Sequence, residues 1–218
     1  MMYACLKVVD RITKQKDRLY GENALGKDKV SDYDHVIGEQ YGIIKGSPEL
    51  LFIKIGRSGT IYGYEHKYLE IAHKVHSKFG CSVAVSANPV DSRYVLKDEI
   101  DIVKTTVGEI SSVIYVGVSN GALEGAWQGW KTPCITAMLL INGPIMINWY
   151  KTKEGIELFK GKEVMMVYGE KDPSYPRISW LDNIRSDVFN YRVYTGQGHN
   201  LDKDTMTELV MEFVEDSI

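Results

Sequence analysis

The segment VIYVGVSNG, residues 113–121, joins a short apolar run to a serine between two glycines. The run Val113–Val116 is typical of a strand buried on both faces, and the small residues after Val118 favour a short helix. Ser119 would then lie on a sharp strand-to-helix turn that exposes its hydroxyl group. Gly117 and Gly121 would allow strand and helix to approach closely, because glycine has no Cβ to collide.

Apolar runs alternate with helix-like segments through the rest of the chain. Predicted strands are Leu50–Ile55, Cys81–Ala87, Val113–Val116, Ile135–Ile141, Val164–Tyr168 and Phe189–Tyr194. Apolar residues at helical spacing predict helices over Tyr64–Phe79, Ile100–Ile110, Lys153–Lys160 and from Thr205 to the end. Strands separated by helices imply a mostly parallel sheet with right-handed crossovers.

The two ends of the chain give more specific expectations. Tyr3–Thr13 and Val36–Lys45 read as an antiparallel strand pair, joined by a loop that includes the polar stretch Gly21–Asp34. Gly80 is expected to end the first helix. Thr205-x-x-Glu208 matches a capping box at the start of the last helix. We expect residues 1–218 to form a single domain.

Composition excludes several classes of protein. The 218 residues are 44% apolar and 25% charged, with a net charge of −3, which is typical of a globular protein and gives no basic surface for nucleic acid. No run of 18 apolar residues predicts a membrane span. Cys5, Cys81 and Cys134 suggest neither a disulfide framework nor a zinc ribbon. The N-terminal residues do not resemble a secretory signal, so a cytoplasmic location is expected.

Two further residues could form an active site with Ser119. Asp172 follows the strand ending at Tyr168, in YGEKDP, and His199 follows the strand ending at Tyr194, in GQGHN. Parallel strands present their carboxyl ends at one edge of a sheet, where ligands bind. A serine hydroxyl needs a nearby base to become nucleophilic, and the base needs an acid to orient it.

These motifs together resemble those of the α/β-hydrolase family, over essentially the whole chain. GVSNG after a strand, GEKDP, and GQGHN before the last helix occur in the family's order of serine, acid and histidine. The resemblance implies that Ser119 is the nucleophile, His199 the general base and then acid, and Asp172 the residue that orients it. It also implies a sheet of about eight mostly parallel strands with an antiparallel start and helices on both faces. Residues 143–162 leave room for one short helix, so no large lid is expected.

The resemblance also implies an oxyanion hole made by two backbone N–H groups. One belongs to Asn120, and the other comes from the loop after Leu50–Ile55. Register favours Arg57, with Ser58 as the alternative. Many family members have His-Gly where this chain has Ile55-Gly56, but a backbone donor survives that difference. The Arg57 side chain could also face the site and favour an acidic substrate.

Each of these residues also has a plainer interpretation. Ser119 could be an ordinary turn serine, Asp172 a turn former before Pro173, and His199 a loop histidine without a role. Some family members carry the acid after the preceding strand, but Asn142 stands there and cannot hold the charge.

A second group of polar residues suggests a metal site only weakly. His66, Glu70 and His73 share one helical face, for which a solvated polar stripe is the favoured reading. We therefore expect neither a metal nor a cofactor.

The expected reaction is cleavage of an ester or thioester of a small acyl substrate through an acyl-enzyme. Pocket residues are proposed from their places near strand ends: Arg57, Tyr62, Tyr64, Ile145, Trp149 and Tyr175. Two alternatives stay open: a catalytically silent binding protein, and an acyltransferase or amidase that uses the same three residues. The oligomeric state cannot be inferred from these patterns.

Overall fold

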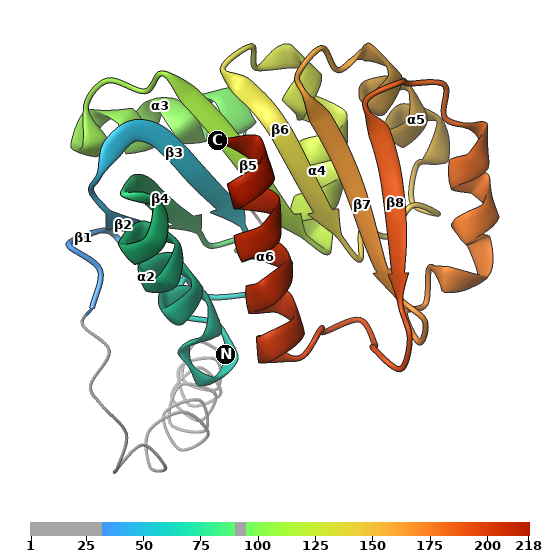
Figure 1. Ribbon diagram of the computed structural model, residues 1–218, viewed down its shortest axis with the longest axis horizontal. Coiled ribbons are helices and arrows are strands. Elements are labelled where there is room, and N and C mark those ends of the chain that lie inside the picture. The colour runs from blue at the N-terminus through green and yellow to red at the C-terminus, as the bar shows by residue number, and fades with distance from the viewer. Residues whose placement is uncertain (1–31, 90–94) are drawn as a thin grey trace, which may run out of the picture. The chain divides into compact units, whose positions relative to one another are not determined.

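The computed structural model describes residues 32–89 and 95–218, which form an eight-stranded sheet (Figure 1). The strand order is β1-β2-β4-β3-β5-β6-β7-β8. β2 runs antiparallel to both of its neighbours, and the other neighbouring strands are parallel. The strands are β1 His35–Ile37, β2 Tyr41–Ile44, β3 Ser47–Lys54, β4 Cys81–Ser86, β5 Ser112–Val118, β6 Ile135–Ile141, β7 Glu163–Gly169 and β8 Phe189–Tyr194. The expected fold class is confirmed.

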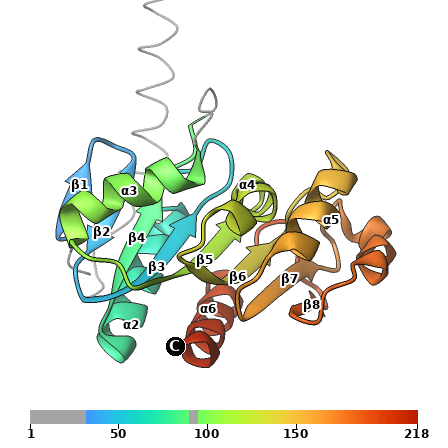
Figure 2. The same ribbon diagram turned by 90° about the horizontal axis from the view of Figure 1, so that it is seen from above.

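Helices cover both faces of this sheet (Figure 2). α2 and α6 lie on one face, and α3, α4 and α5 lie on the other. The α-helices are α2 Lys67–Phe79, α3 Leu96–Val107, α4 Asn120–Gln128, α5 Trp149–Leu158 and α6 Lys203–Ser217; the 3₁₀ helices are η1 Tyr64–His66, η2 Gly129–Lys131 and η3 Tyr175–Asn183. Between β6 and β7 the chain forms only α5, so no large lid is present there.

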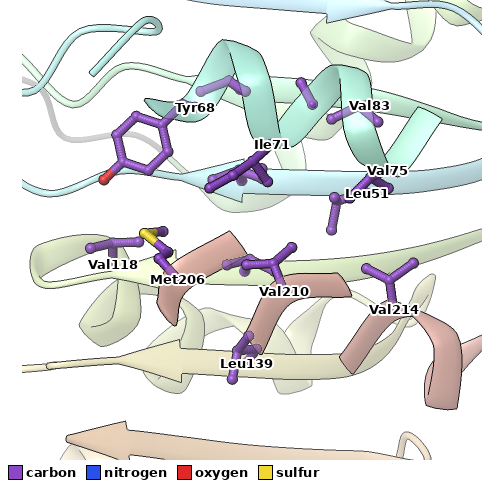
Figure 3. Close-up of a cluster of buried hydrophobic side chains, with 14 of the residues drawn as sticks. Leu51, Tyr68, Ile71, Val75, Val83, Val118, Leu139, Met206, Val210 and Val214 are labelled. Atoms are coloured by element: carbon purple, nitrogen blue, oxygen red, sulfur yellow. The ribbon is translucent and has the colours of Figure 1, made fainter. Parts of the chain in front are cut away.

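Two hydrophobic clusters hold these layers together. Figure 3 shows the cluster beneath α2 and α6, where Ile71 and Val75 face β3 and β4, and Val210 faces β6. Each of these three side chains is fully buried. Full burial of one such side chain contributes about 1.5–3 kcal/mol. The second cluster fills the opposite face, beneath α3, α4 and α5.

The antiparallel start is confirmed, but the strand bounds differ from those expected for Val36–Lys45. Val36–Lys45 is not one strand, because the chain turns at Gly38, with φ 58°, and divides into β1 and β2. β2 pairs with β1 on one side and with β4, which follows β3 and α2 in the chain, on the other. Tyr3–Thr13 and nearly all of Gly21–Asp34 lie outside the described residues.

The helix ends show one confirmed prediction and one error. Gly80 ends α2 in the left-handed conformation, and its N–H donates to the His76 carbonyl over 2.8 Å. The prediction of a capping box formed by Thr205 and Glu208 is wrong. α6 begins earlier, with Asp202 as its N-cap, and the Asp202 carboxylate accepts a hydrogen bond from the Thr205 N–H over 2.8 Å.

Residues Asp32–Ile218 form one unit by their contacts. A single domain over the full length stays a prediction, since residues 1–31 are outside the described part. Within residues 32–89 and 95–218, none of the helices has the length and apolar character that crossing a bilayer requires.

Candidate active site

Ser119 lies on the turn between β5 and α4, in a strained backbone conformation. Its φ is 53° and its ψ is −114°, a combination that L-residues other than glycine rarely adopt. The turn is held by the Ser119 N–H, which donates to the Ile141 carbonyl over 2.8 Å. Helix α4 begins at Asn120, the residue after the serine. The partial positive charge at the N-terminus of this helix favours an anion beside Ser119.

The glycines beside Ser119 allow close contact with neighbouring backbone. A Cβ on Gly117 would lie 2.5 Å from the Gly121 carbonyl oxygen, and a Cβ on Gly121 would lie 2.2 Å from the Lys54 carbonyl oxygen. Real Cβ atoms do not approach backbone so closely, so any larger residue would move strand and helix apart. The expected role of both glycines is consistent with this packing.

The structure brings Ser119, His199 and Asp172 into one hydrogen-bonded chain. The His199 Nε2 lies 2.9 Å from the Ser119 Oγ, and its Nδ1 lies 2.5 Å from the Asp172 Oδ2. The Asp172 side chain is fully buried, whereas that of His199 is 42% exposed. The loops after β5, β7 and β8 supply the three residues, so the carboxyl edge of the parallel sheet assembles them.

Hydrogen bonding fixes the tautomer of His199. The Asp172 carboxylate can only accept, so Nδ1 carries the proton and Nε2 accepts from the Ser119 hydroxyl. The other carboxylate oxygen, Oδ1, accepts from the Ser174 N–H over 2.6 Å. The hydrogen bond to Asp172 raises the pKa of His199, and partial burial opposes that rise.

Asn142 holds the loop that carries His199, a role that sequence reasoning missed. Its side-chain nitrogen donates to the carbonyls of Gly198 and His199 over 3.1 and 2.8 Å. Its side-chain oxygen accepts from the Gly169 N–H over 2.9 Å. One amide thus ties the end of β6 to the end of β7 and to the histidine loop. Its place directly after a buried strand was the available signal.

The expected oxyanion segment lies against Ser119. A Cβ on Gly56 would lie 3.1 Å from the Ser119 Cβ, so this loop approaches the serine closely. The Ser58 N–H donates to the Asn88 carbonyl over 2.7 Å, which removes it as a donor for substrate in this conformation. Arg57 lies between Gly56 and Ser58 in this loop. Asn120 is the first residue of α4, where backbone N–H groups have no acceptor within the helix.

The expected pocket residues differ in exposure and in their contacts. Tyr64 is 72% exposed, and Ile145 is fully buried in the core beneath α5. The Tyr62 hydroxyl donates to the Asp32 carboxylate. Tyr175 begins η3, directly after Ser174. Trp149 lines an open hollow, whose lining residues are Met146, Ile147, Asn148, Trp149, Tyr150, Trp180 and Asn183.

Polar side chains of α2 interact with other parts of the chain. Glu70 pairs with Lys203, and the His76 Nδ1 lies 2.9 Å from the Cys81 carbonyl oxygen. Among residues 32–89 and 95–218, no three His, Cys, Asp or Glu side chains are grouped closely enough to hold a metal ion. Burial raises the pKa of the Cys81 thiol to about 11, which keeps it in the weakly nucleophilic thiol form.

Comparisons with known proteins agree with this architecture. No protein-family model matches the chain, and no curated protein matches it in sequence. Among solved structures, Est1E from Butyrivibrio proteoclasticus is similar with a TM-score of 0.63 and 13% identity, over 86% of this chain and 99% of that one. An α/β serine hydrolase homologue from Coxiella burnetii has a TM-score of 0.60 and 13% identity, with the same coverage.

A third similar structure comes from work on the metagenome-derived lipolytic enzymes LipS and LipT. Its TM-score is 0.64 at 11% identity, over 85% of this chain and all of that one. Sequence identities this low indicate a shared fold and nothing more. The chain has the fold of the α/β hydrolases.

Proposed function

We propose that this protein is a serine hydrolase that cleaves an ester or thioester bond of a small acyl substrate. The observation that carries the proposal is the hydrogen-bonded chain from the Ser119 Oγ through His199 to the buried Asp172 carboxylate. A serine hydroxyl becomes a useful nucleophile when an oriented imidazole can take its proton.

The proposed reaction has two halves. The Ser119 Oγ attacks the substrate carbonyl carbon while its proton moves to the His199 Nε2, and Asp172 stabilises the resulting imidazolium. The carbonyl oxygen becomes an oxyanion that accepts hydrogen bonds from the backbone N–H groups of Asn120 and Arg57. When the oxyanion collapses, His199 returns its proton to the leaving alcohol or thiol. Water then attacks the acyl carbon while His199 takes its proton; the bond from that carbon to the Ser119 Oγ breaks, and His199 returns the proton to the Oγ, which releases the acid and free Ser119.

Two features of the structure support the finer parts of this proposal. Ser58 already donates its N–H to Asn88, so Arg57 is the favoured second donor. The absence of a large insertion between β6 and β7 leaves the serine accessible to small substrates. The similar structures include Est1E with bound ferulic acid and lipolytic enzymes, so an ester is the first substrate to test.

The test is hydrolysis of short p-nitrophenyl esters by wild type and by Ser119→Ala. The proposal predicts that the variant folds normally and loses essentially all hydrolysis. Ser111→Ala is the matched control, since that exposed serine precedes β5 and lies at the amino end of the strand. Equal rates for wild type and folded Ser119→Ala would contradict the proposal.

The same assay separates the alternatives. An acyltransferase would give acyl esters or amides when an alcohol or amine is added, in preference to free acid. A binding protein without activity would neither hydrolyse the esters nor lose anything on the Ser119 substitution.

A further inference from the structure

A partly buried carboxyl group on α4 contacts the side chain of Asn120 and has no place in the reaction steps above. Glu124 is on the first turns of α4, four residues after Asn120. Its Oε1 accepts hydrogen bonds from two side-chain amides, Asn120 Nδ2 over 2.9 Å and Asn88 Nδ2 over 3.3 Å. One oxygen atom therefore joins the nucleophile turn to the segment that follows β4.

Asn88 in turn holds the loop that carries Arg57. The Asn88 side-chain nitrogen also donates to the Ile55 carbonyl over 3.2 Å. The Asn88 backbone carbonyl accepts from the Ser58 N–H over 2.7 Å. The two bonds lie on either side of Gly56 and Arg57. Because Asn88 is 2% exposed, water competes little for them.

We propose that Glu124 is a positioning residue that fixes the two oxyanion donors, at Asn120 and Arg57, relative to each other. This inference rests on the proposed hydrolase function. The path runs from Asn120 through Glu124 and Asn88 to the loop residues Ile55 and Ser58. An oxyanion hole works only when both donors already point at the place where negative charge develops.

The setting of Glu124 favours such a role over simple packing. Its Oε2 is buried and has no hydrogen-bond partner among the described residues, which is a costly state for a carboxylate. Burial raises the pKa of Glu124, and the positive charge of Lys54, which pairs with Glu99 over 2.6 Å, only partly offsets that rise. A carboxyl group kept in so unfavourable a place is expected where function requires its geometry.

The experiment compares Glu124→Met with Glu124→Gln. Methionine matches the length but accepts no comparable hydrogen bond, whereas the glutamine oxygen can accept from both amides. We expect Glu124→Met to lower kcat on a p-nitrophenyl ester by about 100-fold with KM little changed, and Glu124→Gln to keep most of the rate. Glu157→Met is the matched control, because Glu157 on α5 also accepts side-chain and backbone hydrogen bonds but lies outside this path.

Hydrogen exchange supplies a readout that does not need activity. In Glu124→Met, amide exchange in residues 55–60 and 119–121 should rise above that in Glu157→Met. Unchanged exchange in these segments, or a kcat equal to that of Glu157→Met, would overturn the inference.

Two further outcomes are also decisive. If wild type hydrolyses nothing, the proposed function fails, and the exchange result alone decides the role of Glu124. If Glu124→Met does not fold, Asn120→Ala removes one amide of the path and keeps the backbone donor. The inference then requires a lower kcat for Asn120→Ala, and an unchanged value refutes it.

Discussion

Replacing Asn142 by alanine removes three hydrogen bonds that hold the histidine loop to the sheet. Two are donated to the Gly198 and His199 carbonyls and one is accepted from the Gly169 N–H. Each contributes about 1 kcal/mol net. Asn142 also has a φ of 50°, and alanine in this left-handed conformation costs about 1 kcal/mol more. We therefore expect Asn142→Ala to lower the free energy of unfolding by about 4 kcal/mol.

Urea unfolding at constant pH measures this loss, and ester hydrolysis measures its effect on His199. We expect kcat to fall about tenfold, because Asp172 still orients the imidazole while the loop backbone loses its anchor. Asn142→Asp is a sharper variant. At neutral pH its carboxylate would face two carbonyl oxygens and be destabilising, but once the pH falls below the raised pKa of this buried carboxyl the protonated acid can donate one bond.

A stability loss below about 1 kcal/mol for Asn142→Ala would refute the reasoning. So would an Asn142→Asp variant whose stability relative to wild type does not improve at low pH.

The remaining predictions concern the proton acceptor, the nucleophile turn and the last helix. Because the pKa of His199 is raised by Asp172, kcat/KM should increase with pH through an apparent pKa above 6.5; in Asp172→Asn this limb should move to lower pH, and kcat should fall by about 10⁴. The raised pKa also means that His199 stabilises the fold at low pH, and that this contribution is lost as pH rises through the folded-state pKa. Gly121→Ala should lower both the melting temperature and kcat, because its Cβ would lie 2.2 Å from the Lys54 carbonyl oxygen. Asp202→Ala should destabilise α6 by about 1 kcal/mol in urea unfolding, whereas Glu208→Ala should have almost no effect.

Each of these has a clear contrary result. A pH limb that does not move in Asp172→Asn would mean that the carboxylate does not set the basicity of His199. A Gly121→Ala variant with wild-type melting and rate would mean that strand and helix are not tightly packed there. A larger loss of unfolding free energy for Glu208→Ala than for Asp202→Ala would support the capping box instead of the Asp202 N-cap.

The sheet was largely predictable because most of its strands are nearly continuous apolar runs. Ile135–Ile141 matches β6 at both ends, and Phe189–Tyr194, in which Asn190 and Arg192 alternate with apolar residues, matches β8. The division of Val36–Lys45 into two strands was not predictable in the same way. It depends on a turn at Gly38, and a glycine within an apolar stretch is equally compatible with a continuous strand.

Part of the candidate site could also be predicted from the sequence, and part could not. Ser119, Asp172 and His199 could be singled out because each follows a strand, and topology alone brings strand ends to one edge. The contacts of Asn142, and the contact between Asn88 and Glu124, could not be predicted, because they depend on how segments distant in sequence pack together. The exposure of the expected pocket residues could not be predicted for the same reason, since whether Tyr64 faces solvent depends on loop conformation.

Covalent labelling of the folded protein by a fluorophosphonate tests the central claim most directly. This reagent reacts with serines that an adjacent base activates, and peptide mass spectrometry identifies the residue that carries the phosphonate. The account predicts stoichiometric labelling of Ser119, with a rate that falls sharply in His199→Ala. Labelling at another serine, or none in protein shown to be folded, would contradict it.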